Sequence, residues 1–132
     1  MGVGILIISH DGIGESLCDT ADHMIEDSPL KVKCLSASRE CDPDKVLDAA
    51  NSLINELDKG NGVLVLTDLL GTTPSNIAHR LNQHKNSNIN VITGINLSML
   101  IRIYNYPDLN LTDMTNKAYS GGIDGITIAN KS

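Results

Sequence analysis

Two residues with reactive side chains follow strongly apolar runs of the chain. His10 comes just after the run 3–8, and Asp68 directly follows the run 62–67. A neutral imidazole has a lone pair on one ring nitrogen, which can attack an electrophile. A carboxylate that accepts a hydrogen bond from the other ring nitrogen fixes the tautomer and stabilises the cation formed during the attack. The pair predicts that His10 is a nucleophile and that Asp68 orients its ring.

The segment after Asp68 has the composition of an anion-binding turn. Gly71, Thr72 and Thr73 precede Pro74, and a proline in the first turn is typical of a helix start. Backbone N–H groups at a helix N-terminus have no partner within the helix and attract anions, and the two threonines add hydroxyl donors. A nucleophile, an orienting acid and a phosphate site formed by this turn together favour phosphoryl transfer.

Each of these features also has an ordinary explanation when it is taken alone. A histidine at a strand end is more often a solvated or capping residue, an aspartate there is often a turn residue, and Thr73 before a proline fits a simple helix cap. Their conjunction at several predicted strand ends favours the functional interpretation of His10 and Asp68. The remaining histidines are expected on polar surfaces: His23, His79 and His84.

The pattern of apolar residues predicts an α/β fold. Four short apolar runs alternate with amphipathic stretches, which predicts strands over residues 3–8, 30–35, 62–67 and 89–93 and helices that begin near residues 14, 43, 73, 97 and 112. We expect Asp42 and Asn96 to cap the second and fourth helices, and the glycine pair 121–122 to end the last one. Such alternation is typical of an open, mostly parallel sheet with helices on both faces. We expect the strand order 2-1-3-4, a short antiparallel fifth strand over residues 123–128, and one domain over residues 1–132. Ligands bind such sheets beyond the carboxyl ends of the strands, where the strand order reverses.

Composition and charge exclude several classes of function. The chain has 132 residues, a formal net charge of −6, no Trp or Phe and only three Tyr. Proteins that bind nucleic acids present basic surfaces and, for single strands, aromatic stacking platforms, so nucleic-acid binding is excluded. The sequence lacks a signal peptide and a run of about 20 apolar residues. We therefore expect a cytoplasmic protein without direct membrane insertion.

The cysteines and glycines predict neither a metal site nor a nucleotide site. Three cysteines without ligand spacing are expected to be reduced thiols: Cys18, Cys34 and Cys41. Gly12 and Gly14 lack the third glycine of a dinucleotide-binding loop. A receiver domain would need an acidic pair after the first strand, where this chain has Ser9 and His10. Both are weak alternatives, and we expect no cofactor and no metal.

Four segments resemble, in the same order, the motifs of one protein family. They are residues 4–10 (GILIISH), 62–76 (GVLVLTDLLGTTPSN), 94–100 (GINLSML) and 121–126 (GGIDGI). With these motifs, which span nearly the whole chain, the sequence resembles the enzyme IIA component of the mannose family in the bacterial phosphoenolpyruvate-dependent sugar phosphotransferase system.

The resemblance implies a role in a phosphoryl relay for sugar uptake. His10 would accept phosphate from the phosphocarrier HPr, which enzyme I charges, and would pass it to a histidine on a IIB partner. Asp68 would bind the imidazole nitrogen that is not phosphorylated, and Thr73, at the position of the family's serine, would help to hold the phosphate. The family commonly forms homodimers that exchange the last strand, which residues 123–128 would supply here.

Some residues depart from the family's usual pattern. Asp11 stands where the family usually has glycine, Thr72 and Thr73 replace Gly-Ser, and Ser98 replaces proline. The turn over residues 71–76 (GTTPSN) resembles that of free-standing proteobacterial members, which often belong to incomplete systems. The alternative function is therefore a regulatory phosphoprotein, whose phosphorylation state controls the binding of a partner rather than sugar uptake.

Overall fold

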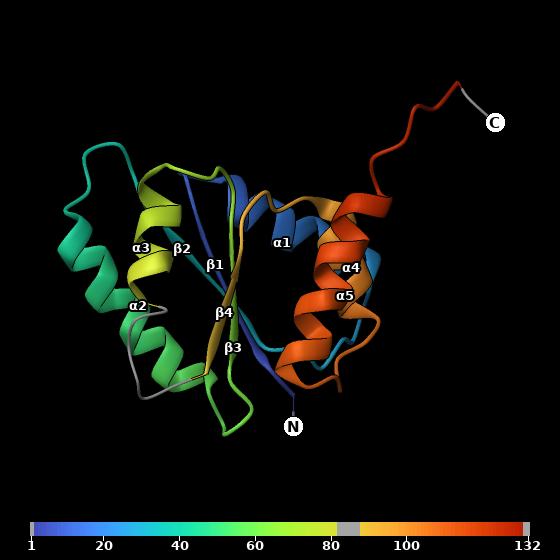
Figure 1. The fold of residues 1–132 in the computed structure, drawn as a ribbon, viewed down its shortest axis with the longest axis horizontal. Coiled ribbons are helices and arrows are strands. Elements are labelled where there is room, and N and C mark those ends of the chain that lie inside the picture. Colours follow the sequence, from blue (N-terminus) through green and yellow to red (C-terminus); the bar gives the residue numbers. More distant parts are fainter. Residues whose placement is uncertain (1, 82–87, 131–132) are drawn as a thin grey trace.

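The computed structural model describes residues 2–81 and 88–130, which form a parallel sheet flanked by helices (Figure 1). The strands are β1 (Gly4–Ser9), β2 (Val32–Ser36), β3 (Val63–Thr67) and β4 (Ile89–Ile92). The helices are α1 (Ile13–Met24), α2 (Pro43–Leu57), α3 (Thr73–Leu81), α4 (Leu97–Tyr104) and α5 (Leu111–Asp124). Neighbouring strands pair in parallel in the order β2-β1-β3-β4. The predicted α/β fold and strand order are confirmed.

Strands β1 and β3 form the buried centre of the sheet. Every residue of both strands is buried, as expected for parallel strands that are covered on both faces. Successive side chains point to opposite faces, so Leu6 and Ile8 pack with α2 and α3, whereas Ile5 and Ile7 pack with α1, α4 and α5. The pairing of Ile8 with Thr67 brings the carboxyl ends of the two central strands together.

Polar side chains begin several helices, as the sequence predicts. The Asp42 carboxylate accepts a hydrogen bond from the backbone of Asp44 at the start of α2, and the Asn96 side chain accepts one from Met99 at the start of α4. Helix α3 begins at Thr73. The carbonyl of Thr72, the residue before it, accepts a hydrogen bond from the Asn76 N–H at 2.9 Å. Thr73 is thus the first helical residue, not the cap that the sequence predicted.

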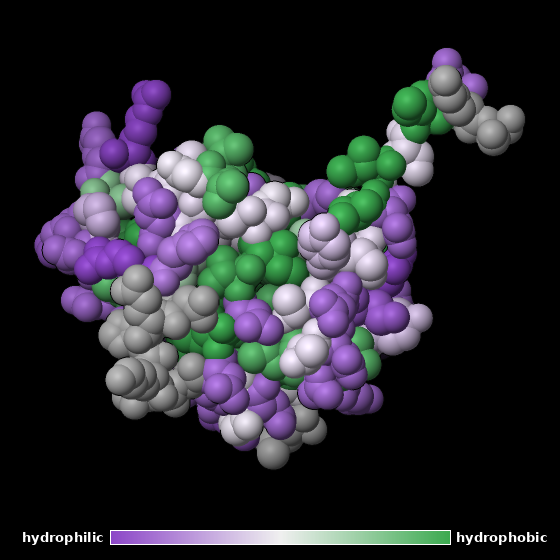
Figure 2. All heavy atoms as spheres, viewed as in Figure 1, coloured by the Kyte–Doolittle hydropathy of each residue, from purple (hydrophilic) through white to green (hydrophobic). Residues whose placement is uncertain are grey.

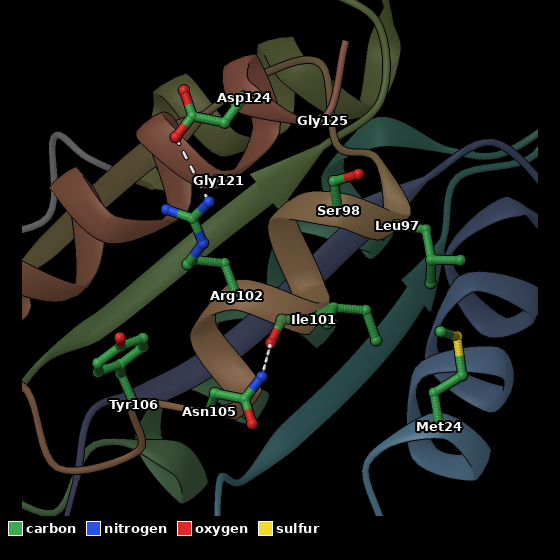
Figure 3. Close-up of a pocket in the computed structure, with 10 residues that line it drawn as sticks. All are labelled: Met24, Leu97, Ser98, Ile101, Arg102, Asn105, Tyr106, Gly121, Asp124 and Gly125. Atoms are coloured by element: carbon green, nitrogen blue, oxygen red, sulfur yellow. Dashed lines mark hydrogen bonds and ion pairs between the residues drawn. The ribbon is translucent and has the colours of Figure 1, made fainter. Parts of the chain in front are cut away.

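Helix α5 continues through the glycine pair at which the sequence predicted its end. A Cβ atom at Gly121 would lie 2.5 Å from the Arg102 Cβ, and one at Gly122 would lie 3.0 Å from the Met99 Cε. Both glycines therefore permit the close packing of α5 on α4 that Figure 3 shows, where the Arg102 guanidinium also pairs with Asp124 at 3.4 Å. A groove beside α4 at this place is lined by none of the predicted site residues.

The predicted fifth strand is not formed in the described part of this chain. Ile123 and Asp124 belong to helix α5, and the residues after Gly125 form no strand. The tail leaves the body of the molecule at the edge where the strands have their carboxyl ends (Figure 1), so its backbone has no strand beside it to pair with. The side chains of Ile126 and Ile128 are 76% and 65% exposed. Exchange of this segment between subunits stays a prediction.

Candidate functional site

The structure brings His10 and Asp68 into direct contact across the ends of the two central strands. The His10 Nδ1 lies 2.8 Å from the Asp68 Oδ2, and the backbone N–H of His10 donates a hydrogen bond to the same oxygen at 2.9 Å. The Asp68 side chain is only 11% exposed, whereas the His10 side chain is 42% exposed. The carboxylate is therefore held inside the site, while the imidazole ring is accessible to a partner.

The Asp68 contact determines which ring nitrogen of His10 is free. An ionised carboxylate only accepts hydrogen bonds, so Nδ1 carries the hydrogen in this contact and Nε2 of the neutral ring keeps the lone pair. Burial by itself would raise the pKa of Asp68, but hydrogen bonds from the backbone and ring of His10 and from the Leu69 N–H outweigh it, and the pKa is lowered. Asp68 is thus ionised at neutral pH and can stabilise a positive charge on the ring.

Ser9 holds the loop that carries His10. Its side chain is buried, with 1% of the residue exposed, at the last position of β1. The hydroxyl donates a hydrogen bond to the His10 carbonyl and accepts one from the Gly14 N–H, each at 2.9 Å. Ser9 thereby joins the end of β1 to the first turn of α1, and the His10 backbone between them is fixed.

Glycines with a left-handed backbone turn the chain at three strand ends. Gly12, Gly71 and Gly94 have φ angles of 82°, 83° and 81°, and no atom lies within 4 Å of a Cβ built on any of them. Glycine is therefore needed here for its backbone conformation and not for lack of space. The Gly94 N–H donates a hydrogen bond to the Asp68 carbonyl at 2.8 Å, so the loop after β4 supports the backbone of Asp68.

The turn between Asp68 and α3 is braced by its own side chains. Ser75 is fully buried, and its hydroxyl donates to the Thr72 carbonyl at 3.1 Å and accepts from the Gly71 N–H at 2.9 Å. The Thr72 hydroxyl, expected to face an anion, donates to the Leu69 carbonyl at 2.5 Å. Thr73 is exposed at the start of α3, and no described hydrogen bond joins its side chain to His10 or Asp68.

Sequence reasoning assigned no role to the two buried serines, Ser9 and Ser75. The sequence did contain a signal for Ser9, which is a small hydroxyl residue at the end of an otherwise apolar buried run. Because a buried hydroxyl needs hydrogen-bond partners nearby, this position indicates that Ser9 bonds to the adjacent loop. The other histidines follow expectation where they are described: His23 and His79 are exposed and bond to carbonyls of their own helices. His84 lies outside the described residues.

Exposed apolar side chains lie close in the sequence to both residues of the site. Leu69 and Leu70, which directly follow Asp68, are 61% and 67% exposed, and Ile13, three residues after His10, is 43% exposed. In residues 2–81 and 88–130 no group of three or more His, Cys, Asp or Glu side chains could hold a metal ion. Nor does that part of the chain contain a helix that is long and apolar enough to cross a membrane.

The chain is similar to known proteins over most of its length. The family model for the PTS system fructose IIA component, EIIA-man, matches residues 4–117, which include His10, Asp68 and the α3 turn. YadI of Escherichia coli K12, named as a phosphotransferase enzyme IIA component, is 26% identical over 98 residues, which are 74% of this chain and 66% of that protein. The match thus spans slightly less than two thirds of the relative's own length.

Solved structures of the same kind superpose on almost the whole chain. The mannose/sorbose-specific IIA subunit from Enterococcus faecalis has a TM-score of 0.84 at 22% identity and covers 100% of this chain and 98% of its own. The EIIA component from Streptococcus agalactiae has a TM-score of 0.80 at 25% identity, with 96% and 97% covered. With the family model matching most of its length, the chain belongs to the mannose family of phosphotransferase system IIA components.

Proposed function

We propose that the chain is a phosphohistidine carrier, in which His10 accepts a phosphoryl group from HPr and passes it to a histidine of a IIB partner. The observation that supports this most directly is the hydrogen bond between His10 Nδ1 and Asp68 Oδ2 at 2.8 Å, in a chain of the IIA family. It leaves Nε2 as the nucleophile on an accessible ring. HPr and enzyme I act in the cytoplasm, and the relay places this chain there as well.

In the proposed transfer, the His10 Nε2 attacks phosphorus on the donor's phosphohistidine. The donor's P–N bond breaks as the new P–N bond to Nε2 forms, so no other leaving group and no cofactor are required. Positive charge develops on the His10 ring during the attack, and the Asp68 carboxylate at Nδ1 stabilises it. The reverse of the same step delivers the phosphoryl group to the IIB histidine.

The start of α3 is the proposed cradle for the phosphoryl oxygens. Backbone N–H groups in the first turn of a helix have no intrahelical acceptor, and the helix dipole favours an anion there. Pro74 lacks an N–H, so the donors of this turn come from its neighbours, among them Thr73 with its exposed hydroxyl. The hydroxyl of Thr72 already donates to Leu69, which leaves Thr73 as the better candidate for a side-chain donor.

The exposed apolar side chains close in the sequence to His10 and Asp68 suit a protein donor rather than a small substrate. Ile13, Leu69 and Leu70 are exposed and lie within three residues of His10 or Asp68 in the sequence. Apolar surface at the core of an interface contributes most of the affinity between proteins. A carrier must release its partner after each transfer, so a small apolar patch with a polar surround is the expected form.

We propose that the protein is a homodimer that pairs the tail of each subunit with the other. Within residues 2–81 and 88–130, strand β4 pairs only with β3, so its other edge can accept a strand. Figure 2 shows apolar surface over β4 between α3 and α5 and apolar side chains along the tail. Light scattering coupled to size exclusion should give the mass of a dimer, and a chain truncated after Gly125 should give that of a monomer.

The regulatory alternative uses the same site with a different target. The turn over residues 71–76 resembles that of free-standing members of incomplete systems, and the exposed carboxylate of Asp11, next to His10, places a negative charge where the family usually has glycine. In that case no IIB partner accepts the phosphoryl group from His10, and the phosphorylated protein binds a partner that the unphosphorylated protein does not. Pull-down with each form distinguishes the two functions.

Phosphotransfer in vitro tests the proposed site. Enzyme I, HPr and labelled phosphoenolpyruvate should transfer one acid-labile phosphoryl group to the protein, and His10→Ala should remove it completely. His79→Ala is the matched control, because His79 is exposed and lies on α3 close in sequence to the proposed cradle. Undiminished labelling of the His10 variant would overturn the assignment.

A further inference from the structure

Two cysteine thiols lie in contact between α1 and β2. The Sγ atoms of Cys18, in the middle of α1, and Cys34, in β2, are 3.1 Å apart. Both side chains pack on the apolar cluster of the α1 face of the sheet, and Cys18 is only 8% exposed. The third cysteine, Cys41, packs on the cluster of the opposite face. The sheet therefore separates Cys41 from the other two, and only Cys18 and Cys34 can react with each other within one chain.

The contact also shifts the pKa values of the two thiols in opposite directions. The hydrogen bond from the Cys34 thiol lowers the pKa of Cys18, against the opposing effects of burial and of the Asp22 charge. The same hydrogen bond, together with burial, raises the pKa of Cys34. Cys18 thus has the greater thiolate character, and the thiolate is the form of cysteine that reacts with oxidants.

We propose that Cys18 and Cys34 are a modification site at which hydrogen peroxide forms a reversible disulfide between α1 and β2. The Cys18 thiolate attacks a peroxide oxygen, the O–O bond breaks, and the hydroxide that leaves takes a proton and becomes water. The sulfur of Cys34 then attacks the sulfenic acid of Cys18, forms the S–S bond and releases a second water. Two thiols and one peroxide give one disulfide and two waters, and two electrons pass from sulfur to oxygen.

The surroundings favour a small neutral oxidant over an anionic one. The carboxylates of Glu15, Asp19 and Asp22 act on the two thiols through their charges. Negative charge at this place repels glutathione disulfide, which is itself anionic, and the burial of Cys18 restricts access to small molecules. Hydrogen peroxide is neutral and close to the size of water, so it meets neither obstacle.

The peptide map of the oxidised wild-type protein is the primary test and needs no variant. The reduced protein is treated with a few equivalents of hydrogen peroxide, then denatured and alkylated with N-ethylmaleimide. We expect a mass lower by about 2 Da before alkylation, a cross-linked peptide pair that contains residues 18 and 34, alkylation of Cys41 alone, and recovery of all three thiols with dithiothreitol. Three alkylated thiols after the same treatment, or a disulfide through Cys41 between chains, would overturn the proposal.

Variants separate the pair from general thiol oxidation. Cys41→Ala should form the disulfide at the wild-type rate, whereas Cys18→Ala and Cys34→Ala should each abolish it. The disulfide closes a loop between positions 16 residues apart, so the oxidised protein should unfold at a urea concentration roughly 1–2 M higher than the reduced protein. An unchanged midpoint would show that the cross-link distorts the native packing and would contradict the contact as described. No step of this test depends on phosphorylation of His10.

Discussion

Replacement of Asp68 with Asn removes the charge opposite the His10 ring and keeps the shape of the side chain. The Asn oxygen can still accept the hydrogen bond from the His10 backbone N–H, whereas the hydrogen bond from the Leu69 N–H to the other carboxylate oxygen is lost. The ring loses the anionic acceptor at 2.8 Å that stabilises positive charge during phosphoryl attack. We expect the variant to fold and to accept the phosphoryl group slowly.

The size of the effect follows from the strength of that one hydrogen bond. A hydrogen bond to a charged group contributes about 1.5–3 kcal/mol, and each 1.4 kcal/mol or so of the barrier is a factor of about ten in rate. Loss of the charge on this acceptor in the transition state therefore slows transfer by at most roughly 10- to 150-fold. Because the His10 side chain is 42% exposed, water screens part of the charge, and we expect the lower part of that range.

Rapid-quench measurement of labelled phosphoryl transfer from HPr gives the rate directly. The matched control is Asp11→Asn, the same chemical change at an exposed acid directly next to His10 that makes no described hydrogen bond to the ring. It should transfer at least as fast as the wild type, because it removes a negative charge near the incoming phosphoryl group. A rate within twofold of wild type for Asp68→Asn, or an equal loss in both variants, would refute the proposed role of Asp68.

Three further predictions concern stability, each measured by urea unfolding. Asp68 has a lowered pKa in the folded protein, so the contribution of its ionised carboxylate is complete above the unfolded value of about 3.9 and is lost as the pH falls through the folded value. The difference in the free energy of unfolding between wild type and Asp68→Asn should therefore shrink as the pH falls below about 4. Gly121→Ala should lower the free energy of unfolding by about 1–3 kcal/mol, because the added methyl group overpacks against α4. Asn116→Ala, on the exposed face of α5, should lower it by less than about 0.5 kcal/mol. Ser9→Ala should lower the free energy of unfolding by about 1–3 kcal/mol, because it leaves the buried Gly14 N–H without its acceptor. Thr67→Val should leave that free energy unchanged or raise it, since the buried Thr67 hydroxyl has no described hydrogen-bond partner.

The strands and their alternation with helices could be predicted because their signals are local. Continuous apolar runs such as residues 62–67 occur where both faces of a strand are covered, and alternation of these runs with helices leads to a parallel sheet. Helix starts with an acid or amide cap, such as Asp42 and Asn96, were found for the same reason, since the capping side chain and the backbone N–H that donates to it are two or three residues apart.

Features that depend on a distant partner could not be predicted in this way. A glycine pair usually ends a helix, but Gly121 and Gly122 lie inside α5 because α4 packs against them, and nothing local signals that packing. Residues 123–128 have the composition of a strand, yet a strand forms only beside another strand, and the described chain offers none to this segment.

The sequence by itself determined the chemical identity of the site: a nucleophilic ring in His10, an acid in Asp68, and a turn at the start of a helix. Only the tertiary structure decided how these groups meet. The parallel pairing of β1 with β3 places His10 Nδ1 and Asp68 Oδ2 2.8 Å apart. This contact in turn determines which nitrogen of the ring is free. The buried hydroxyls of Ser9 and Ser75 hold the two loops in place. Residue types are local properties of the chain, but a hydrogen bond between positions 58 residues apart exists only once the sheet has formed.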